Sequence, residues 1–283
     1  MNTDKTYHVH ITAKENPMTL NLREIWAYRD LIVLFTKRSF NLIYKQTILG
    51  PAWVVLTPLM TSVVYTVVFG EMAGLSTAGV PKLLFYLSSQ ALWSFFSACL
   101  NRNAQTFISN AHVFGKVYFP RLTVPISNLL FSCIQFLVQL TMVSVLLVPY
   151  CLQGTIRLRP TMLPLLILPL LITGLLGLAL GILVSSVTTK YRDLQHLVGF
   201  GVQLWMYSSP VIYPVSQFSD GLWYRILLLN PMTAPMELFR LALLGTGTVH
   251  VVSVLSTLVF SGILIPLSIL VFNRVEKNFI DTV

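Results

Sequence analysis

The residues of this chain that could do chemistry are few, and most of them lie outside its apolar stretches. Glu237 and Arg240 are three residues apart, so on one helix their side chains can form an ion pair. His8 and His10 have no further ligand at a useful spacing, which predicts no metal site. The three cysteines have neither metal nor redox spacing and are interpreted as small buried hydrophobes: Cys99, Cys133 and Cys151.

The elements that must position these residues are membrane helices. The chain is 55% hydrophobic and 10% charged, against about 25% charged residues in soluble domains. Six stretches contain no Asp, Glu, Lys, Arg or His, and each can cross or nearly cross a hydrocarbon core of about 30 Å as a helix. We therefore expect an all-α polytopic membrane protein with six transmembrane helices, at residues 52–70, 83–100, 122–148, 161–187, 197–213 and 251–272.

The uncharged spans exclude two classes of function. Ion-coupled carriers keep ionisable residues inside the membrane, and an intramembrane enzyme needs polar catalytic groups there. The chain also has no phosphate-binding loop, since its only Gly-Lys pair, at Gly115 and Lys116, is followed by Val117 and Tyr118. We therefore expect no enzyme activity and no cofactor on this chain, and a separate ATPase partner that binds ATP and Mg.

The positions of the basic residues predict the topology. The net charge of +9 could indicate nucleic-acid binding, but fourteen of the nineteen Lys and Arg residues fall before the first span, in the second and fourth loops, and in the tail. This asymmetry orients membrane helices with the basic side in the cytoplasm. We therefore expect two cytoplasmic termini and no nucleic-acid partner.

The pattern divides the chain into four parts. They are a polar leader (residues 1–20), an amphipathic helix (21–49), a six-span domain (51–273) and a cytoplasmic tail (274–283). In the amphipathic segment, Leu22, Ile25 and Trp26 share an arc with five later apolar residues, as in helices that lie on a membrane surface. A soluble helix packed on a partner is the alternative. Gly50 and Pro51 then break the chain, and Pro51 suits the first turn of a new helix.

One connecting segment and one strip of small residues also have distinctive patterns. A short helix is expected at Thr106–Phe114, between Asn103 and Gly115, in a polar segment suited to docking below the membrane. Gly177, Gly181 and Ser185 recur every four residues, which lets a neighbouring helix approach closely.

Residues 215–245 are expected to form a re-entrant hairpin in the outer leaflet. Its second apolar piece, Pro231–Leu244, is about 21 Å long as a helix, too short to span the membrane. Asn230 is a good helix cap and Gly245 a good stop. Within the hairpin, Glu237 and Arg240 are expected to hold its shape, while direct contact of Arg240 with a pyrophosphate-linked substrate is the alternative.

Four ordered motifs resemble a known family. They are Arg38–Leu49 with Pro51, Trp53 and Pro58; Asn110 with Lys116–Arg121; Tyr191–Asp193 leading into Leu204-Trp205 and Ser209–Pro214; and Leu229–Thr233 with Phe239-Arg240. Over residues 22–272 the chain resembles permease subunits of the type-2 exporter branch of ABC transporters, within that branch those exporting O-antigen, capsular polysaccharide or teichoic acid.

The resemblance implies a homodimer in the bacterial inner membrane that works with two copies of a cytoplasmic ABC ATPase. It implies an interface helix at the N-terminal amphipathic segment, a coupling segment at residues 103–118 and an outer gate at 215–245. The residues expected to couple to the ATPase are Thr106, Phe107, Asn110, Phe114, Lys116, Tyr191, Arg192 and Asp193, although Tyr191–Asp193 could instead only anchor the topology. The expected gate residues are Pro210, Pro214, Asn230, Pro231, Glu237 and Arg240.

The cargo that this family suggests is a lipid-linked glycan. Aromatic faces with a polar edge suit sugar rings, although Trp and Tyr also gather at membrane interfaces for other reasons. The expected conduit residues are Trp53, Tyr65, Phe69, Tyr86, Trp93, Trp205, Tyr207 and Tyr213. The sequence thus favours a permease that exports a lipid-linked polysaccharide across the inner membrane, with a drug or another lipid as the alternative cargo.

Overall fold

The computed structural model describes residues 22–45, 47–114, 116–117, 119–156, 159–188, 193–218 and 220–279. Within these ranges all regular secondary structure is helical, which confirms the predicted all-α fold. The α-helices are α1 (Leu22–Ala27), α2 (Arg29–Tyr44), α3 (Trp53–Tyr65), α4 (Lys82–Ala104), α5 (Thr106–Phe114), α6 (Thr123–Leu152), α7 (Ile167–Thr188), α8 (Leu194–Tyr207), α9 (Leu222–Leu229), α10 (Thr233–Leu244) and α11 (Val251–Phe279).

Four shorter segments extend or connect these helices. A 3₁₀ turn, η1 (Gly50–Ala52), leads into α3, and a π-helical segment, η2 (Thr66–Met72), continues it. The 3₁₀ segment η3 (Pro160–Leu166) precedes α7, and η4 (Val215–Gln217) follows α8. Gly50 has a φ of 49° and Pro51 occupies the first turn, as the sequence predicts for the start of the first span.

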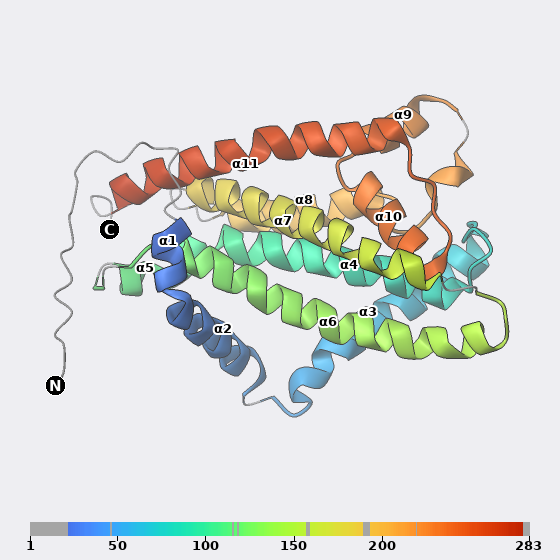
Figure 1. The fold of residues 1–283 in the computed structure, drawn as a ribbon, viewed down its shortest axis with the longest axis horizontal. Coiled ribbons are helices and arrows are strands. Elements are labelled where there is room, and N and C mark those ends of the chain that lie inside the picture. The colour runs from blue at the N-terminus through green and yellow to red at the C-terminus, as the bar shows by residue number, and fades with distance from the viewer. Residues whose placement is uncertain are drawn as a thin grey trace.

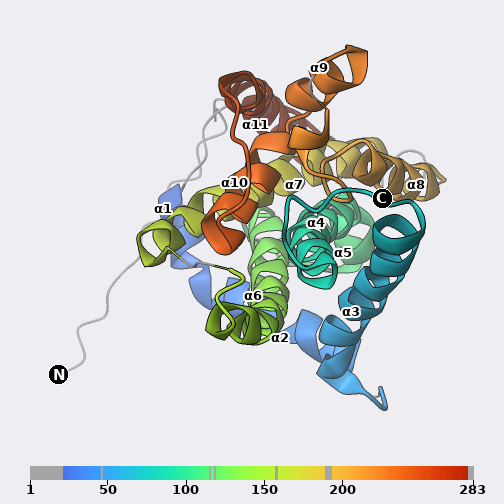
Figure 2. The ribbon, with the colours of Figure 1, turned by 90° about the vertical axis from the view of Figure 1, so that its right-hand side faces the viewer.

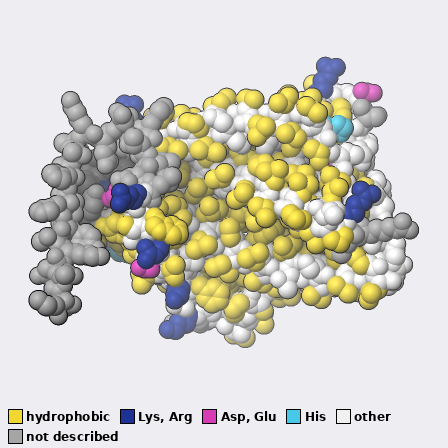
Figure 3. Space-filling model, in the orientation of Figure 1, with side chains coloured by type: hydrophobic (Ala, Val, Ile, Leu, Met, Phe, Trp, Pro, Cys, Tyr) yellow, Lys and Arg dark blue, Asp and Glu magenta, His cyan; other side chains and the backbone are white. Residues whose placement is uncertain are grey.

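Among the described residues, five helical segments are long and apolar enough to cross a membrane, and a sixth is possible if the bent α9–α10 pair is one span. The five are Gly50–Met72, Lys82–Ala104, Thr123–Leu152, Pro160–Thr188 and Val251–Val275. Figure 3 shows the corresponding surface, on which apolar side chains cover the middle of the molecule and charged ones lie toward its two ends.

The predicted fifth span at residues 197–213 is only partly helical. Helix α8 has 14 residues, about 21 Å, and turns replace helix after Tyr207. Pro210 is the cause, because proline has no N–H to donate and disfavours helical geometry in the residue before it. By length, α8 therefore falls short of a complete crossing.

Helix α4 forms the centre of the bundle. In the most apolar stretch of the α4 span 72% of the residues are buried within the chain, against 17% in the corresponding stretches of the α3 and α11 spans. Figure 2 shows α4 enclosed by α3, α6, α7 and α8. The contact with α7 is the closest, because a Cβ added to Gly181 would lie 2.5 Å from the Asn103 Cβ, and one added to Gly177 would lie 2.7 Å from the Cys99 Cβ. The predicted strip of small residues is thus confirmed.

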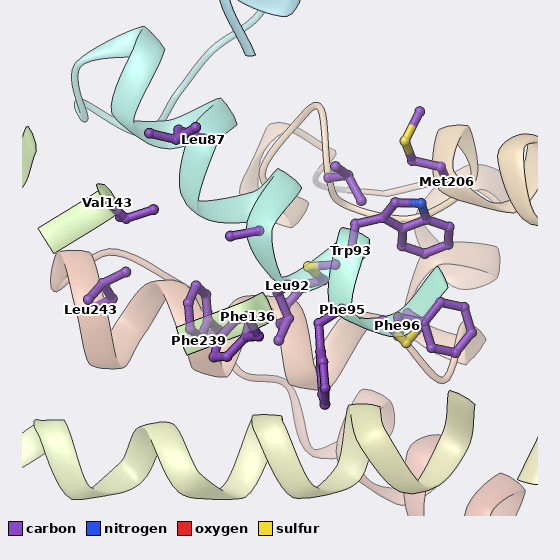
Figure 4. Close-up of a cluster of buried hydrophobic side chains, with 14 of the residues drawn as sticks. Leu87, Leu92, Trp93, Phe95, Phe96, Phe136, Val143, Met206, Phe239 and Leu243 are labelled. Atoms are coloured by element: carbon purple, nitrogen blue, oxygen red, sulfur yellow. The ribbon is translucent and has the colours of Figure 1, made fainter. Parts of the chain in front are cut away.

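Aromatic side chains fill the space where α4, α6 and α10 meet. The ring of Phe136 lies 5.3 Å from that of Phe95 and 6.0 Å from that of Phe239, and Figure 4 shows these rings beside Leu92. All three are buried. Fully burying a side chain of this size stabilises the fold by roughly 1.5–3 kcal/mol, so this cluster anchors α10 to the bundle.

The predicted amphipathic helix is divided into α1 and α2 at Tyr28. Helix α2 packs against α6, where Phe35 shares a buried cluster with Val124 and the Thr36 hydroxyl donates to the Ser127 carbonyl at 3.4 Å. The predicted apolar arc is therefore shared between two environments. Ile25, Ile32 and Tyr44 are buried, whereas Trp26, Val33, Phe40 and Ile43 are exposed.

The two ends of the bundle have different contents (Figure 1). Helices α1 and α5 and the last turns of α11 lie at one end, while α9 and α10 lie at the other. The first described helix and the end of the last one therefore lie at the end that carries the predicted coupling segment.

Candidate functional site

Glu237 and Arg240 form a buried ion pair at the centre of the predicted gate. Both residues are 1% exposed, and Arg240 Nη1 donates to Glu237 Oε1 at 2.8 Å. Arg240 Nε and Nη2 donate to the Ser89 hydroxyl on α4 at 3.1 and 2.8 Å, and its guanidinium lies 4.2 Å from the ring centre of Phe85. The pair thus joins α10 to α4.

The same ion pair also holds the segments that precede and follow the α9–α10 hairpin in the chain. Arg240 Nη2 donates to the carbonyls of Pro210 and Val211, and Glu237 Oε1 accepts from the Val215 amide at 3.2 Å. Glu237 Oε2 accepts from the Thr248 amide at 2.9 Å. One ion pair therefore fixes the turn after α8, η4 and the loop before α11.

The loop before α11 crosses α10 at very short range. Gly247 has a φ of 156°, and a Cβ added there would lie 2.4 Å from the Glu237 carbonyl oxygen. Only glycine permits this approach. Gly245, in the left-handed region at φ 70°, ends α10 as the sequence predicts.

Asn230 forms a second polar junction at the bend between α9 and α10. Its Oδ1 accepts from Trp205 Nε1 at 3.1 Å and from the Met232 amide at 3.0 Å, and its Nδ2 donates to the Ser208 carbonyl at 2.9 Å. The side chain thus caps a turn, and α10 begins at Thr233, two residues later than the predicted Pro231. The bend between the two helices is 82°.

All six predicted gate residues are buried, and the structure brings them together. Pro210 and Pro214 bracket the turn that Arg240 holds, while Pro231 accepts a hydrogen bond from the Thr257 hydroxyl on α11 at 2.9 Å. Sequence reasoning missed Ser89 and Thr248. A paired hydroxyl, Ser88-Ser89, inside an apolar run is the signal that could have identified the first.

Most of the predicted conduit residues lie along one side of α4, between α3 and α8. Tyr65 packs against Tyr86 with ring centres 6.2 Å apart and against Phe69 at 5.5 Å. Trp205 lies 6.4 Å from Trp93, and the Tyr65 hydroxyl reaches the Met206 sulfur at 3.4 Å. These side chains form an aromatic cluster shared by three helices, which we call the α3–α4–α8 face. Tyr86 and Trp93 are buried within the chain, and Tyr65, Phe69 and Trp205 are half-buried at its surface.

Three other predicted conduit residues are placed differently. Tyr207 is exposed at the end of α8, and its carbonyl accepts from the Tyr213 hydroxyl at 2.9 Å. Trp53, which is 49% exposed, lies beside a separate cleft between α3, α4 and α6. The structure therefore groups Tyr207 and Tyr213 near the gate and sets Trp53 apart from the other rings.

Helix α5 carries the predicted coupling residues, and several of them face inward. Thr106, Phe107 and Phe114 are buried, and the Phe107 ring stacks on Phe272 of α11 with centres 5.2 Å apart. Asn110 is half-buried and donates to the Thr106 carbonyl at 3.0 Å. The outward residues of this segment are Ser109, His112, Lys116 and Val117.

The other predicted coupling residues lie between α7 and α8. Asp193 is exposed directly before α8, whereas Tyr191 and Arg192 lie outside the described residues. Within the described ranges, no three His, Cys, Asp or Glu side chains come together as metal ligands.

Long apolar helices around a central α4, a buried polar hairpin at one end and a short helix at the other define a multi-pass membrane protein. The chain belongs to the ABC-2 type transporter family, whose sequence model matches residues 30–244.

Three related proteins have names that state a function. The chain is 26% identical to the O-antigen export system permease protein RfbA of Klebsiella pneumoniae over 256 residues, which cover 89% of this chain and 94% of that protein. A second Klebsiella pneumoniae protein of the same name is 24% identical over the same shares of the two chains. The protein of that name from Myxococcus xanthus is 27% identical over 77% of this chain and 82% of its own length.

Proposed function

We propose that this chain is the permease subunit of an ATP-driven exporter that moves a lipid-linked polysaccharide across the bacterial inner membrane. The observation that carries the proposal is the similarity to O-antigen export permeases over nearly the whole chain. The alternative cargo, a drug or another lipid, is not favoured by these relatives. The uncharged spans support a passive conduit whose energy comes from a separate ABC ATPase.

The α3–α4–α8 face is the proposed lining of the conduit. Its half-buried rings, Tyr65, Phe69 and Trp205, offer flat apolar area, and Tyr65 and Trp205 add a polar group at the ring edge, which suits a neutral glycan. The α3 span is 17% buried within one chain, so much of its surface is free to meet lipid or another protein. We propose that a second copy of the chain covers this face and that the conduit runs between the two copies.

Helix α5 is the proposed docking element for the ATPase. It lies at the end of the bundle opposite the gate, and its inward rings attach it to α11 while Ser109 and His112 point outward. A short helix held rigidly by its buried face can transmit displacement to the bundle. The proposal places this end in the cytoplasm, in accordance with the distribution of basic residues.

The α9–α10 pair is proposed as a re-entrant gate. Both helices lie at the same end of the bundle in Figure 1, and the pair bends by 82°. The polar side chains of the pair, Asn230, Glu237 and Arg240, form hydrogen bonds within the protein. Non-helical backbone is tolerated at membrane depth only when its polar groups are satisfied in this way. On the same grounds, the exposed apolar residues of α1 and α2 are proposed to rest on the membrane surface.

Reconstitution tests the transport function. We expect proteoliposomes with this chain and its ATPase to move a lipid-linked glycan only when ATP is supplied, and a proton or sodium gradient to move none. Transport driven by such a gradient with this chain alone would refute the assignment. Transport of a small drug with no glycan movement would instead support the alternative cargo.

Cysteine cross-linking tests the homodimer separately. In a background without the native cysteines, Val67→Cys on the outer surface of the α3 span should form a disulfide-linked dimer in membranes. Val259→Cys on α11 is the matched control, since both positions are exposed and apolar. Equal cross-linking from both positions, or from α11 alone, would contradict a dimer across the α3–α4–α8 face.

A further inference from the structure

A short polar network crosses the bundle near the end of α4. Arg102 Nη2 donates to Gln135 Oε1 on α6 at 2.9 Å, and Gln135 Nε2 in turn donates to the hydroxyl of Tyr44 at the end of α2. These contacts join residues 33 and 91 positions apart in the sequence. The network therefore links the N-terminal helix to two membrane-spanning helices.

Arg102 is the charged member of this network, and it has no counter-charge among the described residues. Its guanidinium lies 4.3 Å from the ring centre of Phe131, and its Nε is buried without a hydrogen-bond partner. Within the described ranges the ion pairs are Glu71–Lys82 and Glu237–Arg240, which leave Arg102 and Arg38 unpaired. Arg102 is half-buried, and a cation held partly out of water without an anion is costly, so this arginine is suited to bind an anionic ligand.

A cavity of about 200 Å³ opens beside Arg102, between α2, α4, α5 and α6. Arg38 of α2 lines it as well, and its wall carries no acidic side chain among the described residues. The other polar lining residues are Ser39, Gln105, Ser109, Asn110, Ser127 and Asn128. Two guanidinium groups with hydroxyls and amides around them match the oxygens of a phosphate group.

A cleft of about 280 Å³ lies on the other side of the same network, between α3, α4 and α6. Tyr44 and Gln135 line it, and Arg102 lines the cavity, so the same network borders both spaces. The cleft is mainly apolar, with Val54, Pro58 and Phe136 in its wall and the exposed Trp53 and Thr57 along its edge. Its mainly apolar lining suits a hydrocarbon chain.

We propose that these two spaces form one binding site for a phosphate-bearing lipid. The phosphate lies in the cavity against Arg102 and Arg38, and the hydrocarbon chain lies in the cleft beside Trp53. Lys37 and Lys45 line an adjoining groove on α2 and add positive charge around the head group. The bound phosphate would join α2, α4, α5 and α6, and so would steady the position of α5.

Native mass spectrometry of the purified full-length chain with added lipids tests the proposal. We expect phosphatidylglycerol to bind, and diacylglycerol, which has the same chains but no phosphate, to bind much more weakly. Arg102→Gln and Arg38→Gln should each lower the affinity for phosphatidylglycerol by about tenfold, as loss of charge-assisted hydrogen bonds requires. Arg225→Gln is the matched control, because Arg225 is an exposed arginine on α9 at the opposite end of the bundle.

Competition then identifies the source of the phosphate. If a polyprenyl pyrophosphate displaces phosphatidylglycerol and depends on the same arginines, the site takes the lipid carrier of the glycan. If phosphatidylglycerol is not displaced, the ligand is a membrane phospholipid. Since Arg38 is exposed, Arg38→Gln should fold normally, and its unchanged affinity for phosphatidylglycerol would overturn the proposal. Equal binding of diacylglycerol would overturn it as well.

Discussion

Removing the carboxylate of Glu237 should destabilise the protein far more than removing that of an exposed ion pair. In Glu237→Ala the guanidinium of Arg240 stays buried without its counter-charge, and the amides of Val215 and Thr248 lose their acceptor. Breaking one side of a buried ion pair costs about 3–5 kcal/mol. The orphaned amide of Val215, which is buried, adds roughly 1–3 kcal/mol, whereas Thr248 is exposed and water can replace its acceptor.

The chain provides a matched control in Glu71 and Lys82. Their nitrogen–oxygen distance is 2.9 Å, nearly the same as the 2.8 Å of the gate pair, but their side chains are 63% and 38% exposed. Exposed pairs contribute about 0–1 kcal/mol. We therefore expect Glu71→Ala to unfold close to the wild-type temperature and Glu237→Ala to unfold well below it.

Thermal unfolding of the purified variants in one detergent measures the difference. The double variant Glu237→Met with Arg240→Met should recover part of the loss, because an apolar pair leaves no unpaired charge. If Glu237→Ala and Glu71→Ala lower the unfolding temperature equally, the buried pair does not hold the gate as described.

Three further predictions follow from the packing. Gly181→Ala should destabilise the α4–α7 contact by about 1–3 kcal/mol, whereas Gly262→Ala, with open space around it, should not, and thermal unfolding compares the two. Trp205→Phe keeps the ring contacts but loses the bond to Asn230, so unfolding should show a cost of about 0.5–1.5 kcal/mol, and a cost like that of a large-to-small core substitution would contradict this. His112→Glu on the outer side of α5 should uncouple ATP hydrolysis from export without unfolding the chain. Phe107→Ala should instead unfold the chain, because it loses about 3–5 kcal/mol of core packing. Normal coupling in His112→Glu would show that the outer side of α5 does not dock on the ATPase.

The elements that sequence reasoning predicted well depend on local chemistry. Uncharged runs gave five of the six spans, Gly50 and Pro51 marked the start of the first, and Gly245 marked the end of α10. Glycine spacing on α7 predicted the close contact with α4. In each case the signal lies in a few neighbouring residues whose backbone or size permits one arrangement.

The elements that it predicted poorly depend on which face of a helix is buried. Lipid is as apolar as a protein core, so hydropathy does not distinguish the two environments. On α7, Leu171 and Leu175 are exposed whereas Gly174 and Gly177 are buried, the reverse of a soluble helix. Phe107 and Phe114, which the family resemblance assigned to the ATPase contact, are buried within the chain.

The placement of charge also bears on where a phosphate-linked substrate can bind. All three guanidinium nitrogens of Arg240 already donate to protein acceptors, and the residue is 1% exposed. A guanidinium that is buried and hydrogen-bonded in this way holds protein segments together and is not accessible to a ligand. Arg102 differs, since its Nε has no partner and a cavity lies beside it. Contact with a phosphate group is therefore expected at the cavity between α2, α4, α5 and α6. The gate is not expected to bind the charge of a passing substrate.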